Sequence, residues 1–351
     1  MGEKKEKKSG GVKRTLITVL CVLLALILIF VTCVGVYVNY LLGKIKRVDM
    51  SNEVTISPEQ LEQILGSDPD LSPMDPSEDL PNLDDEELPD QDPVENPDHV
   101  INILLIGQDT RTSGVRARSD SMILVTFNTR AKTVTFTSFM RDCYVQIPGY
   151  ASNKLNHAYQ YGGMGLINET LNVNFGVEID GDVEIDFSQF KDIIDLLGGV
   201  EISLTAKEAE YLRNGHKFDV KTGKNLLTGA QALAYARLRE IDSDYQRTER
   251  QRKVLMALVE AYKDKPVDQM LELLEKLMER VTTNMTDAQM WEYGLKVIPM
   301  LAGARYSSQR LPADGTFKQG NAQVRPGLKG WFQYAIDFEA NREIMRKIFE
   351  E

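Results

Sequence analysis

The spacing of apolar positions divides residues 99–351 into short strands and amphipathic helices. An apolar run at 101–107 ends in glycine and predicts a buried strand, and runs at 122–128 and 133–139 predict two more, joined by a short turn. Alternation of such strands with helices predicts an α/β layered domain. Further strands are expected at 183–187 and 305–311, and helices at 155–161, 165–174, 189–197, 206–213, 230–236, 267–280, 287–301 and 338–349.

A longer apolar run, Leu16 to Val38, precedes the domain and carries no charge over 23 residues. As a helix it would measure about 35 Å, against about 30 Å for the hydrocarbon core of a bilayer. A secretory signal peptide has a shorter apolar region and a small-residue cleavage site, which is not seen here. We therefore predict a basic cytoplasmic tail at 1–14 and an uncleaved transmembrane helix at 15–42, with the rest of the chain outside the cell.

Charge is distributed unevenly along the chain. Residues 67–98 contain 13 acidic residues, seven prolines and no lysine or arginine. Residues 1–66 carry nine basic and six acidic residues, so the formal charge of −11 leaves −1 for residues 99–351. The acidic segment repels itself and buries little apolar surface, so residues 43–98 are expected to form an extended tether that ends near Pro97. The nearly neutral domain lacks the basic excess that is typical of nucleic-acid binders.

Cysteine and histidine give no sign of a disulfide or of a zinc site. Only Cys143 lies in the predicted domain, because Cys21 and Cys33 fall in the apolar run. A disulfide within the domain and a paired-cysteine zinc motif are therefore excluded.

A cluster of arginines occurs between residues 237 and 252. From Arg247 the stretch has helical spacing, which places Arg247 and Gln251 on one helix face. The planar guanidinium group suits phosphate oxygens, so the cluster fits an anion-binding site. The alternative is a solvated helix face whose arginines pair with nearby acidic residues. The cluster is Arg237, Arg239, Arg247, Arg250, Gln251 and Arg252, and the acidic residues are Glu240, Asp242, Asp244 and Glu249.

Aspartate and arginine also recur at the ends of the predicted strands. Asp109 follows the first strand, Asp120 precedes the second, and Arg141 with Asp142 follows the third. Ligands of α/β proteins bind just beyond strand ends. Carboxylates such as Asp109 and Asp120 suit Mg²⁺, which completes its shell with phosphate and water. Each aspartate alone could instead be a turn or cap residue, but repetition at three strand ends favours a site for an anion and a metal.

The same segments, taken in order, resemble the LytR-CpsA-Psr family of cell-wall glycopolymer ligases. They are GQDTR, RSDSMIL, SFMRDCYVQIPG, KLNHAYQYGG, VEIDFSQFKDIIDLLGGVEI, LTGAQALAYARLR and DYQRTERQRKVL. The resemblance implies a three-layer α/β/α catalytic domain at 99–311, with a mixed central sheet and a hydrophobic pocket for a polyprenyl chain. Residues 312–351 match less well and are expected to form an extension packed on the domain.

The resemblance also implies roles for individual residues. Asp109 and Asp120 would hold Mg²⁺ or Mn²⁺, and together with Arg141 and Arg247 they make up the expected catalytic set. Core packing is the default role of any one aromatic residue. The residues expected to bind the pyrophosphate and head group are Arg118, Arg141, Lys154, Arg237, Arg239, Arg247 and Gln251. The aromatic residues that are candidates for the lipid pocket are Phe127, Phe136, Phe139, Phe175 and Phe190.

The reaction that the resemblance implies is transfer of an anionic glycopolymer, of the teichoic-acid or capsular kind, from a polyprenyl pyrophosphate carrier to peptidoglycan. The metal and the arginines would stabilise charge on the transferring phosphoryl group and on the leaving polyprenyl phosphate. Two alternatives remain open. One is a non-catalytic polyprenyl-phosphate-binding regulator at the membrane, of the transcriptional-attenuator kind, and the other is a pyrophosphatase that acts on the same carrier. Nucleic acid is not an expected partner.

Overall fold

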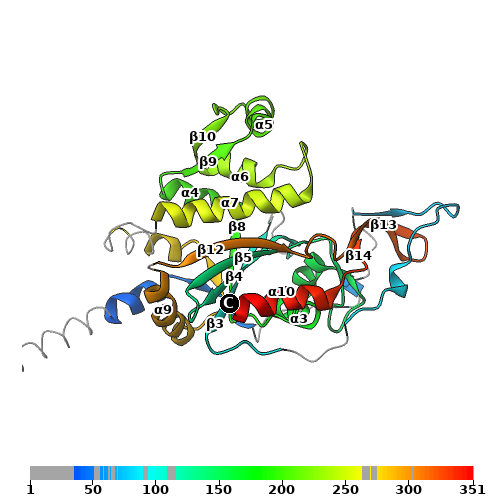
Figure 1. Cartoon of the computed structure of the whole chain (residues 1–351), viewed down its shortest axis with the longest axis horizontal. Helices are drawn as coiled ribbons and strands as arrows, with labels where there is room; N and C mark the ends of the chain where they lie inside the picture. The colour runs from blue at the N-terminus through cyan, green and yellow to red at the C-terminus, as the bar shows by residue number, and fades with distance from the viewer. Residues whose placement is uncertain are drawn as a thin grey trace, which may run out of the picture. The chain divides into compact units, whose positions relative to one another are not determined.

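The protein separates into two compact units, Met1–Ile45 and Lys46–Glu351, and the second contains the central sheet (Figure 1). In the first unit a helix runs from 35 to 42. No helix in the described part of the chain combines the length and the apolar character needed to cross a membrane. The basic tail and most of the expected transmembrane segment lie outside the described residues. The computed structural model describes residues 35–50, 56–57, 59–61, 64, 68, 70–89, 94–108, 116–262, 269, 275–301 and 303–350.

A mixed seven-stranded sheet, in the order β1-β11-β8-β3-β4-β5-β12, forms the centre of the second unit. Its strands are β1 (Lys46–Arg47), β3 (Val100–Gln108), β4 (Ser119–Asn128), β5 (Thr133–Phe139), β8 (Gly181–Asp186), β11 (Thr282–Thr283) and β12 (Arg305–Leu311). β4 is antiparallel to both β3 and β5, whereas β8 is parallel to β3 and β12 is parallel to β5. The mixed α/β fold expected from the sequence is confirmed.

Helices cover both faces of this sheet. One face packs against α3 (Leu155–Phe175) and α10 (Phe338–Glu350), and the other packs against α7 (Asp244–Tyr262) and the end of α9 (Asp287–Leu301). The helices α4 (Phe187–Leu196), α5 (Ala206–His216) and α6 (Gly229–Arg237) share a separate core with α7. Successive residues of a strand point to opposite faces. Met122 and Leu124 of β4 therefore share a core with α3 and α10, while Ile123 and Val125 share one with α7 and the end of α9. Figure 1 shows α7 on one side of the sheet and α3 with α10 on the other.

The helix α3 joins two helices that are expected separately from the sequence. Gly162 and Gly163 interrupt it with non-helical backbone angles, so the axis bends between its halves. Gly163 has a φ of 64°, which glycine adopts at no steric cost. The two helices expected at 155–161 and 165–174 are therefore present, one on each side of this kink.

Two smaller sheets are not anticipated by the apolar pattern. β9 (Val200–Leu204) pairs antiparallel with β10 (Gly223–Leu227), and α5 lies between them in the sequence. The two strands pack with α4, α5, α6 and α7 in a second core. The second small sheet has the order β13-β14-β2, with β13 (Lys318–Arg325), β14 (Leu328–Tyr334) and β2 (Leu71–Pro73). Its strands come from opposite ends of the domain sequence, so a local pattern could not reveal their pairing.

The helix α6 is fixed in position by its cap and by a close approach to α4. Thr228 and Gln231 form a capping box at its start, which satisfies the first free amide groups of the helix. Gly229 allows the approach, because a Cβ atom there would lie 2.2 Å from the carbonyl oxygen of Lys191 on α4. These contacts determine where the far end of α6, and with it Arg237, is placed.

The acidic segment differs from the extended tether that is expected at 43–98. β2 adds to the edge of β14, and Leu83 in η2 (Leu83–Asp85) is buried in a core with side chains of β13 and β14. Glu78 forms an ion pair with Lys329 of β14. Backbone partners on a strand edge and basic side chains on the domain thus offset the repulsion within the segment.

Candidate active site

A polar cavity of about 340 Å³ opens where β3, β4 and β5 meet α6 and α7. Its lining includes Asp120, Arg141 and Arg247, which are three of the four residues in the expected catalytic set. The fourth, Asp109, lies outside the described residues. The complete lining is Gly107, Asp120, Ser121, Arg141, Phe187, Arg237, Arg239, Glu240, Arg247 and Gln251.

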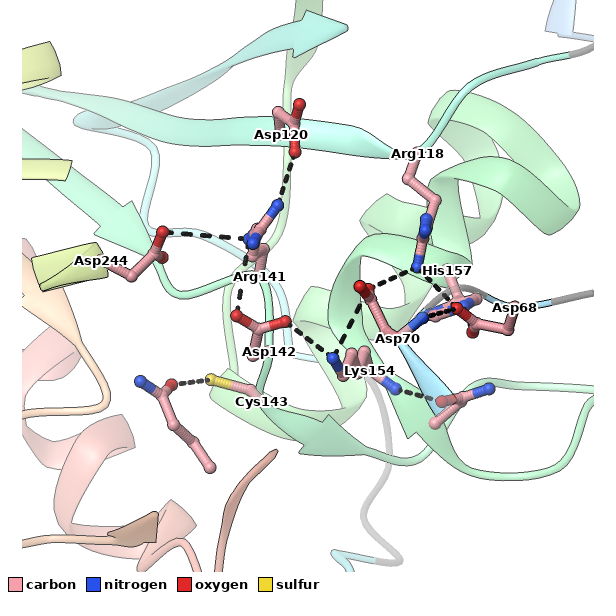
Figure 2. Close-up of polar contacts among 12 residues, drawn as sticks. Asp68, Asp70, Arg118, Asp120, Arg141, Asp142, Cys143, Lys154, His157 and Asp244 are labelled. Atoms are coloured by element: carbon pink, nitrogen blue, oxygen red, sulfur yellow. Dashed lines mark hydrogen bonds and ion pairs between the residues drawn. The ribbon is translucent and has the colours of Figure 1, made fainter. Parts of the chain in front are cut away.

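The carboxylates of Asp120 and Asp244 form ion pairs with the arginines around this cavity. Arg141 donates from Nη1 to Asp120 Oδ1 at 2.8 Å, and Arg239 Nη2 lies 3.6 Å from the same oxygen. Arg247 donates to the carbonyl oxygen of Asp120 at 2.9 Å, and its Nε lies 2.7 Å from Asp244 Oδ1. Figure 2 shows Arg141 between Asp120 and Asp244. Guanidinium groups from the end of β5 and from α7 are thereby held at the start of β4.

The electrostatics of the cavity favour a bound anion. Burial and the charges of Arg247 and Arg141 lower the pKa of Arg239. Burial opposes ionisation of Asp244, but the charges of Arg247 and Arg141 outweigh burial and lower the pKa of this carboxyl group. Guanidinium groups therefore crowd one another here, and phosphate oxygens would relieve that repulsion.

An apolar cavity of about 100 Å³ adjoins the polar one. Ser121 donates a hydrogen bond to Gln251 Oε1 at 3.0 Å at the junction. Residues that line both cavities are Gly107, Ser121, Phe187, Arg237 and Gln251. The apolar one is also lined by Leu105, Ile106, Ile123, Ile185, Asp186, Phe190, Leu233, Ala236 and Leu255. Together they suit a ligand with an anionic head and an apolar tail.

Of the five aromatic candidates for the lipid pocket, only Phe190 lines the apolar cavity. Phe139 and Phe175 pack with ring centroids 5.1 Å apart in the core on the α3 face of the sheet. Phe127 and Phe136 belong to the core beneath α7. Phe139 does not reach the apolar cavity because its side chain points to the α3 face of the sheet. Phe127 does not reach it because this residue lies at the end of β4 that is remote from the cavity.

Arg118 and Lys154 lie beside the polar cavity and do not belong to its lining. Arg118 Nη1 is 2.7 Å from Asp70 Oδ2, and Lys154 Nζ is 3.1 Å from Asp142 Oδ1. Asp142 Oδ2 in turn is 3.4 Å from Arg141 Nε. Both cations expected at the pyrophosphate are therefore paired with carboxylates of the chain itself.

Some arginines of the cluster between residues 237 and 252 line the cavity, as an anion-binding site requires, and others pair with acidic residues of the chain. Arg237, Arg239 and Arg247 line the cavity, but Arg250 is buried and forms ion pairs with Glu208 and Asp242. Arg250 therefore joins α7 to α5. Asp244 is a site residue that the sequence predicts only as an ion-pair partner; its spacing of three residues from Arg247 on one helix face is the sequence feature that indicates this contact.

Carboxylate chemistry at the cavity is compatible with a divalent metal ion. Within the described residues, no three or more His, Cys, Asp and Glu side chains are grouped to hold a metal. Mg²⁺, however, commonly binds one or two carboxylates and takes its other ligands from phosphate and water. Asp120 fits that role, because its contacts with Arg141 and Arg239 both fall on Oδ1.

Known proteins share both the sequence pattern and the fold of this chain. Residues 77–327 match the LytR_cpsA_psr family. The chain is 32% identical over 252 residues to the polyisoprenyl-teichoic acid–peptidoglycan teichoic acid transferase TagU of Bacillus mycoides (strain KBAB4). That alignment covers 71% of this chain and 77% of TagU.

Two solved structures with bound ligands are also similar. TagT bound to LIIa-WTA has a TM-score of 0.58 and 26% identity, covering 77% of this chain and 97% of that chain. The LytR-CPS2A-psr family protein YwtF (TagT) with bound octaprenyl pyrophosphate lipid has a TM-score of 0.55 and 26% identity, covering 77% of this chain and 99% of that chain.

Proposed function

Because this chain belongs to the LytR_cpsA_psr family, we propose that it transfers an anionic glycopolymer from a polyprenyl pyrophosphate carrier to peptidoglycan. The name of the relative TagU and the ligands in the TagT structures support this proposal. The observation that carries it is the arginine-lined polar cavity adjoining an apolar one.

In the proposed reaction, a hydroxyl oxygen of peptidoglycan attacks the phosphorus atom that carries the glycopolymer. The bond from this phosphorus to the bridging oxygen breaks, polyprenyl phosphate leaves, and a phosphodiester forms. Arg141, Arg239 and Arg247 stabilise the negative charge that develops on both phosphates. The hydroxyl proton passes to a base, and Asp120 and Glu240 are the carboxylates in the described lining of the cavity.

A divalent cation, Mg²⁺ or Mn²⁺, is part of the proposal. Asp120 would hold it together with Asp109, and the bound ion would supply further stabilisation of charge at the phosphates. Asp120 would then serve chiefly as a ligand, which leaves Glu240 the better placed of the two to accept a proton.

The proposal also places the site outside the cell. The segment from Leu16 to Val38 would anchor the chain, and its basic flank would stay in the cytoplasm. The catalytic unit would then face the outer leaflet and the peptidoglycan, where the donor and the acceptor meet.

Arg239→Gln tests this function. The Arg239 side chain is 41% exposed, so its loss should leave the fold intact. We expect transfer from a prenyl-pyrophosphate-linked glycopolymer to peptidoglycan to fall at least about tenfold, because a hydrogen bond to a charged group contributes about 1.5–3 kcal/mol. Arg346→Gln, which changes an exposed arginine of α10, is the matched control. Equal rates in the two variants would contradict the proposed role of the cavity.

The products of the same assay separate the remaining alternatives. Free polymer phosphate, formed with water as acceptor, would indicate a pyrophosphatase. Donor binding without turnover would indicate a regulator. Full transfer in the presence of a chelator would remove the metal from the mechanism.

A further inference from the structure

Asp68 and Asp70, which we call the acidic pair, form ion pairs with basic side chains beside the polar cavity (Figure 2). Asp70 Oδ2 lies 2.7 Å from Arg118 Nη1 and 3.6 Å from Lys154 Nζ. Asp68 Oδ1 lies 3.2 Å from Arg118 Nη1, and its Oδ2 lies 2.9 Å from His157 Nε2. The Asp68 side chain is only 2% exposed, so this contact excludes solvent.

A continuous series of charges of alternating sign joins the acidic pair to the cavity (Figure 2). Lys154 Nζ is 3.1 Å from Asp142, Asp142 is 3.4 Å from Arg141, and Arg141 donates to Asp120 in the cavity lining. Without the acidic pair, Lys154 would keep its ion pair with Asp142, and Arg118 would have no ion-pair partner among the described carboxylates. One positive charge would then be in excess next to the cavity, and a phosphate group would be attracted to it.

The acidic pair precedes a short edge strand. β2 pairs with β14 through Leu71, Ser72 and Pro73. Gly330 of β14 makes room for this segment, because a Cβ atom there would lie 2.8 Å from Leu71 Cδ2 and 2.9 Å from the carbonyl oxygen of Asp70. So short a pairing contributes few backbone hydrogen bonds, so the acidic pair is held mainly by its ion pairs with Arg118, Lys154 and His157, and a phosphate group can compete for these.

The family resemblance already assigns Arg118 and Lys154 to a phosphate group of the donor; we propose that the acidic pair is an intramolecular stand-in for that phosphate at these two cations. The carboxylates of Asp68 and Asp70 take the places of phosphate oxygens, so the donor and the acidic pair compete for the same cations. The inference rests on the proposed function and extends it. The phosphate could belong to the carrier pyrophosphate or to a phosphodiester of the polymer, and the recognition chemistry is the same.

Two variants open the subsite by different means. Asp70→Asn removes the charge that faces Arg118 and Lys154, from a side chain that is 36% exposed. Gly330→Ala places a methyl group against the Asp70 backbone and changes no charge. Asp75→Asn is the matched control, because it removes one charge from the same segment, and its side chain accepts hydrogen bonds from Ser77.

Calorimetric titration of the full chain in detergent micelles measures the competition. The ligands are a glycerol phosphate trimer, which represents the polymer, and inorganic pyrophosphate, which represents the carrier. We expect Asp70→Asn and Gly330→Ala to bind the trimer about tenfold more tightly than the unmodified chain, with no gain in Asp75→Asn. A gain for the trimer alone assigns the subsite to the polymer, and a gain that includes pyrophosphate assigns it to the carrier.

Equal affinities of Asp70→Asn, Asp75→Asn and the unmodified chain for both ligands would overturn the inference. If Gly330→Ala fails to fold, the comparison of the two Asn variants decides alone. Pyrophosphate binding by Arg239→Gln tests the proposed function separately. If Arg239→Gln loses affinity for pyrophosphate and Asp70→Asn changes no affinity, the acidic pair is not a stand-in for phosphate, and the transferase proposal is retained.

Discussion

Arg247 and Lys224 illustrate how burial determines the value of an ion pair in this protein. The Arg247 side chain is 3% exposed and is held by Asp244 and by the carbonyl oxygen of Asp120. Lys224 and Glu201 form their pair at 79% and 63% exposure, where solvent weakens the attraction. A buried guanidinium group with fixed partners keeps its direction before a ligand arrives, which is what charge stabilisation in a transition state requires.

Asp68 should make the stability of the fold depend on pH in the acid range. Burial opposes its ionisation, but hydrogen bonds from His157 and from the Asp70 amide outweigh burial and lower the pKa of Asp68 to about 2. The unfolded chain takes up this proton near pH 4, so the contribution of about 2 kcal/mol is present above that pH and disappears as the pH falls to about 2.

Urea unfolding of Asp68→Asn at two pH values measures this contribution. The substitution is expected to lower the free energy of unfolding by about 2 kcal/mol at pH 7 and by much less near pH 2. Asp75→Asn, in the same segment, should have little effect at either pH. A loss for Asp68→Asn that is equal at both pH values would show that the carboxylate charge is not the cause.

At the scale of elements, the apolar cavity depends on how α6, α7 and the strand ends meet. Two of its lining residues are small, Gly107 on β3 and Ala236 on α6, and they leave space that larger side chains would occupy. The cap of α6 and its approach to α4 at Gly229 hold this geometry. The cavity is therefore a product of helix placement.

Leu233→Trp tests whether this cavity receives the lipid chain. The larger side chain would fill space between α6 and the sheet, so the affinity for a long prenyl pyrophosphate should fall about tenfold, which corresponds to roughly two buried methylene groups. The affinity for inorganic pyrophosphate should be unchanged. Leu226→Trp, at a position on β10 that is 67% exposed, is the control. Equal loss for both ligands would indicate general disruption of the site.

At the scale of the whole molecule, the catalytic unit begins well before residue 99. Leu83 is 1% exposed, β2 extends the sheet of β13 and β14, and Asp68 pairs with Arg118 and His157. The family match likewise begins at residue 77. Asp68 and residues 70–89, which are described parts of the acidic segment, therefore belong to the folded unit.

Truncation measures what the acidic segment contributes. A chain that starts at residue 99 should unfold with a free energy at least about 3 kcal/mol below that of a chain that starts at residue 46. Loss of the buried Leu83 side chain accounts for about 2 kcal/mol, and the unpaired Arg118 and His157 account for the remainder. Urea denaturation of the two chains gives the comparison. Equal stabilities would mean that the segment is only loosely attached.

The central strands β3, β4 and β5, the α/β class and the family are predictable from the sequence, because the period of apolar residues and short motifs are local properties of the chain. The sequence also singles out Asp120, Arg141 and Arg247, since charged residues at strand ends and at helical spacing are visible without a structure. The small sheets are not predictable from local sequence. For example, β2 and β14 pair across more than 250 positions, and neither strand shows a strong apolar pattern.

Which charged side chains face one another depends on how distant segments of the chain pack in space. Asp68 and Asp70 belong to a segment whose composition favours an extended chain, yet they pair with Arg118, Lys154 and His157. Composition describes the repulsion within a segment, whereas the partners that offset it come from distant parts of the chain. The same limit explains Phe139 of β5 and Phe175 of α3, which pack in the core because the position of each side chain on its strand or helix, rather than its aromatic character, determines what it contacts.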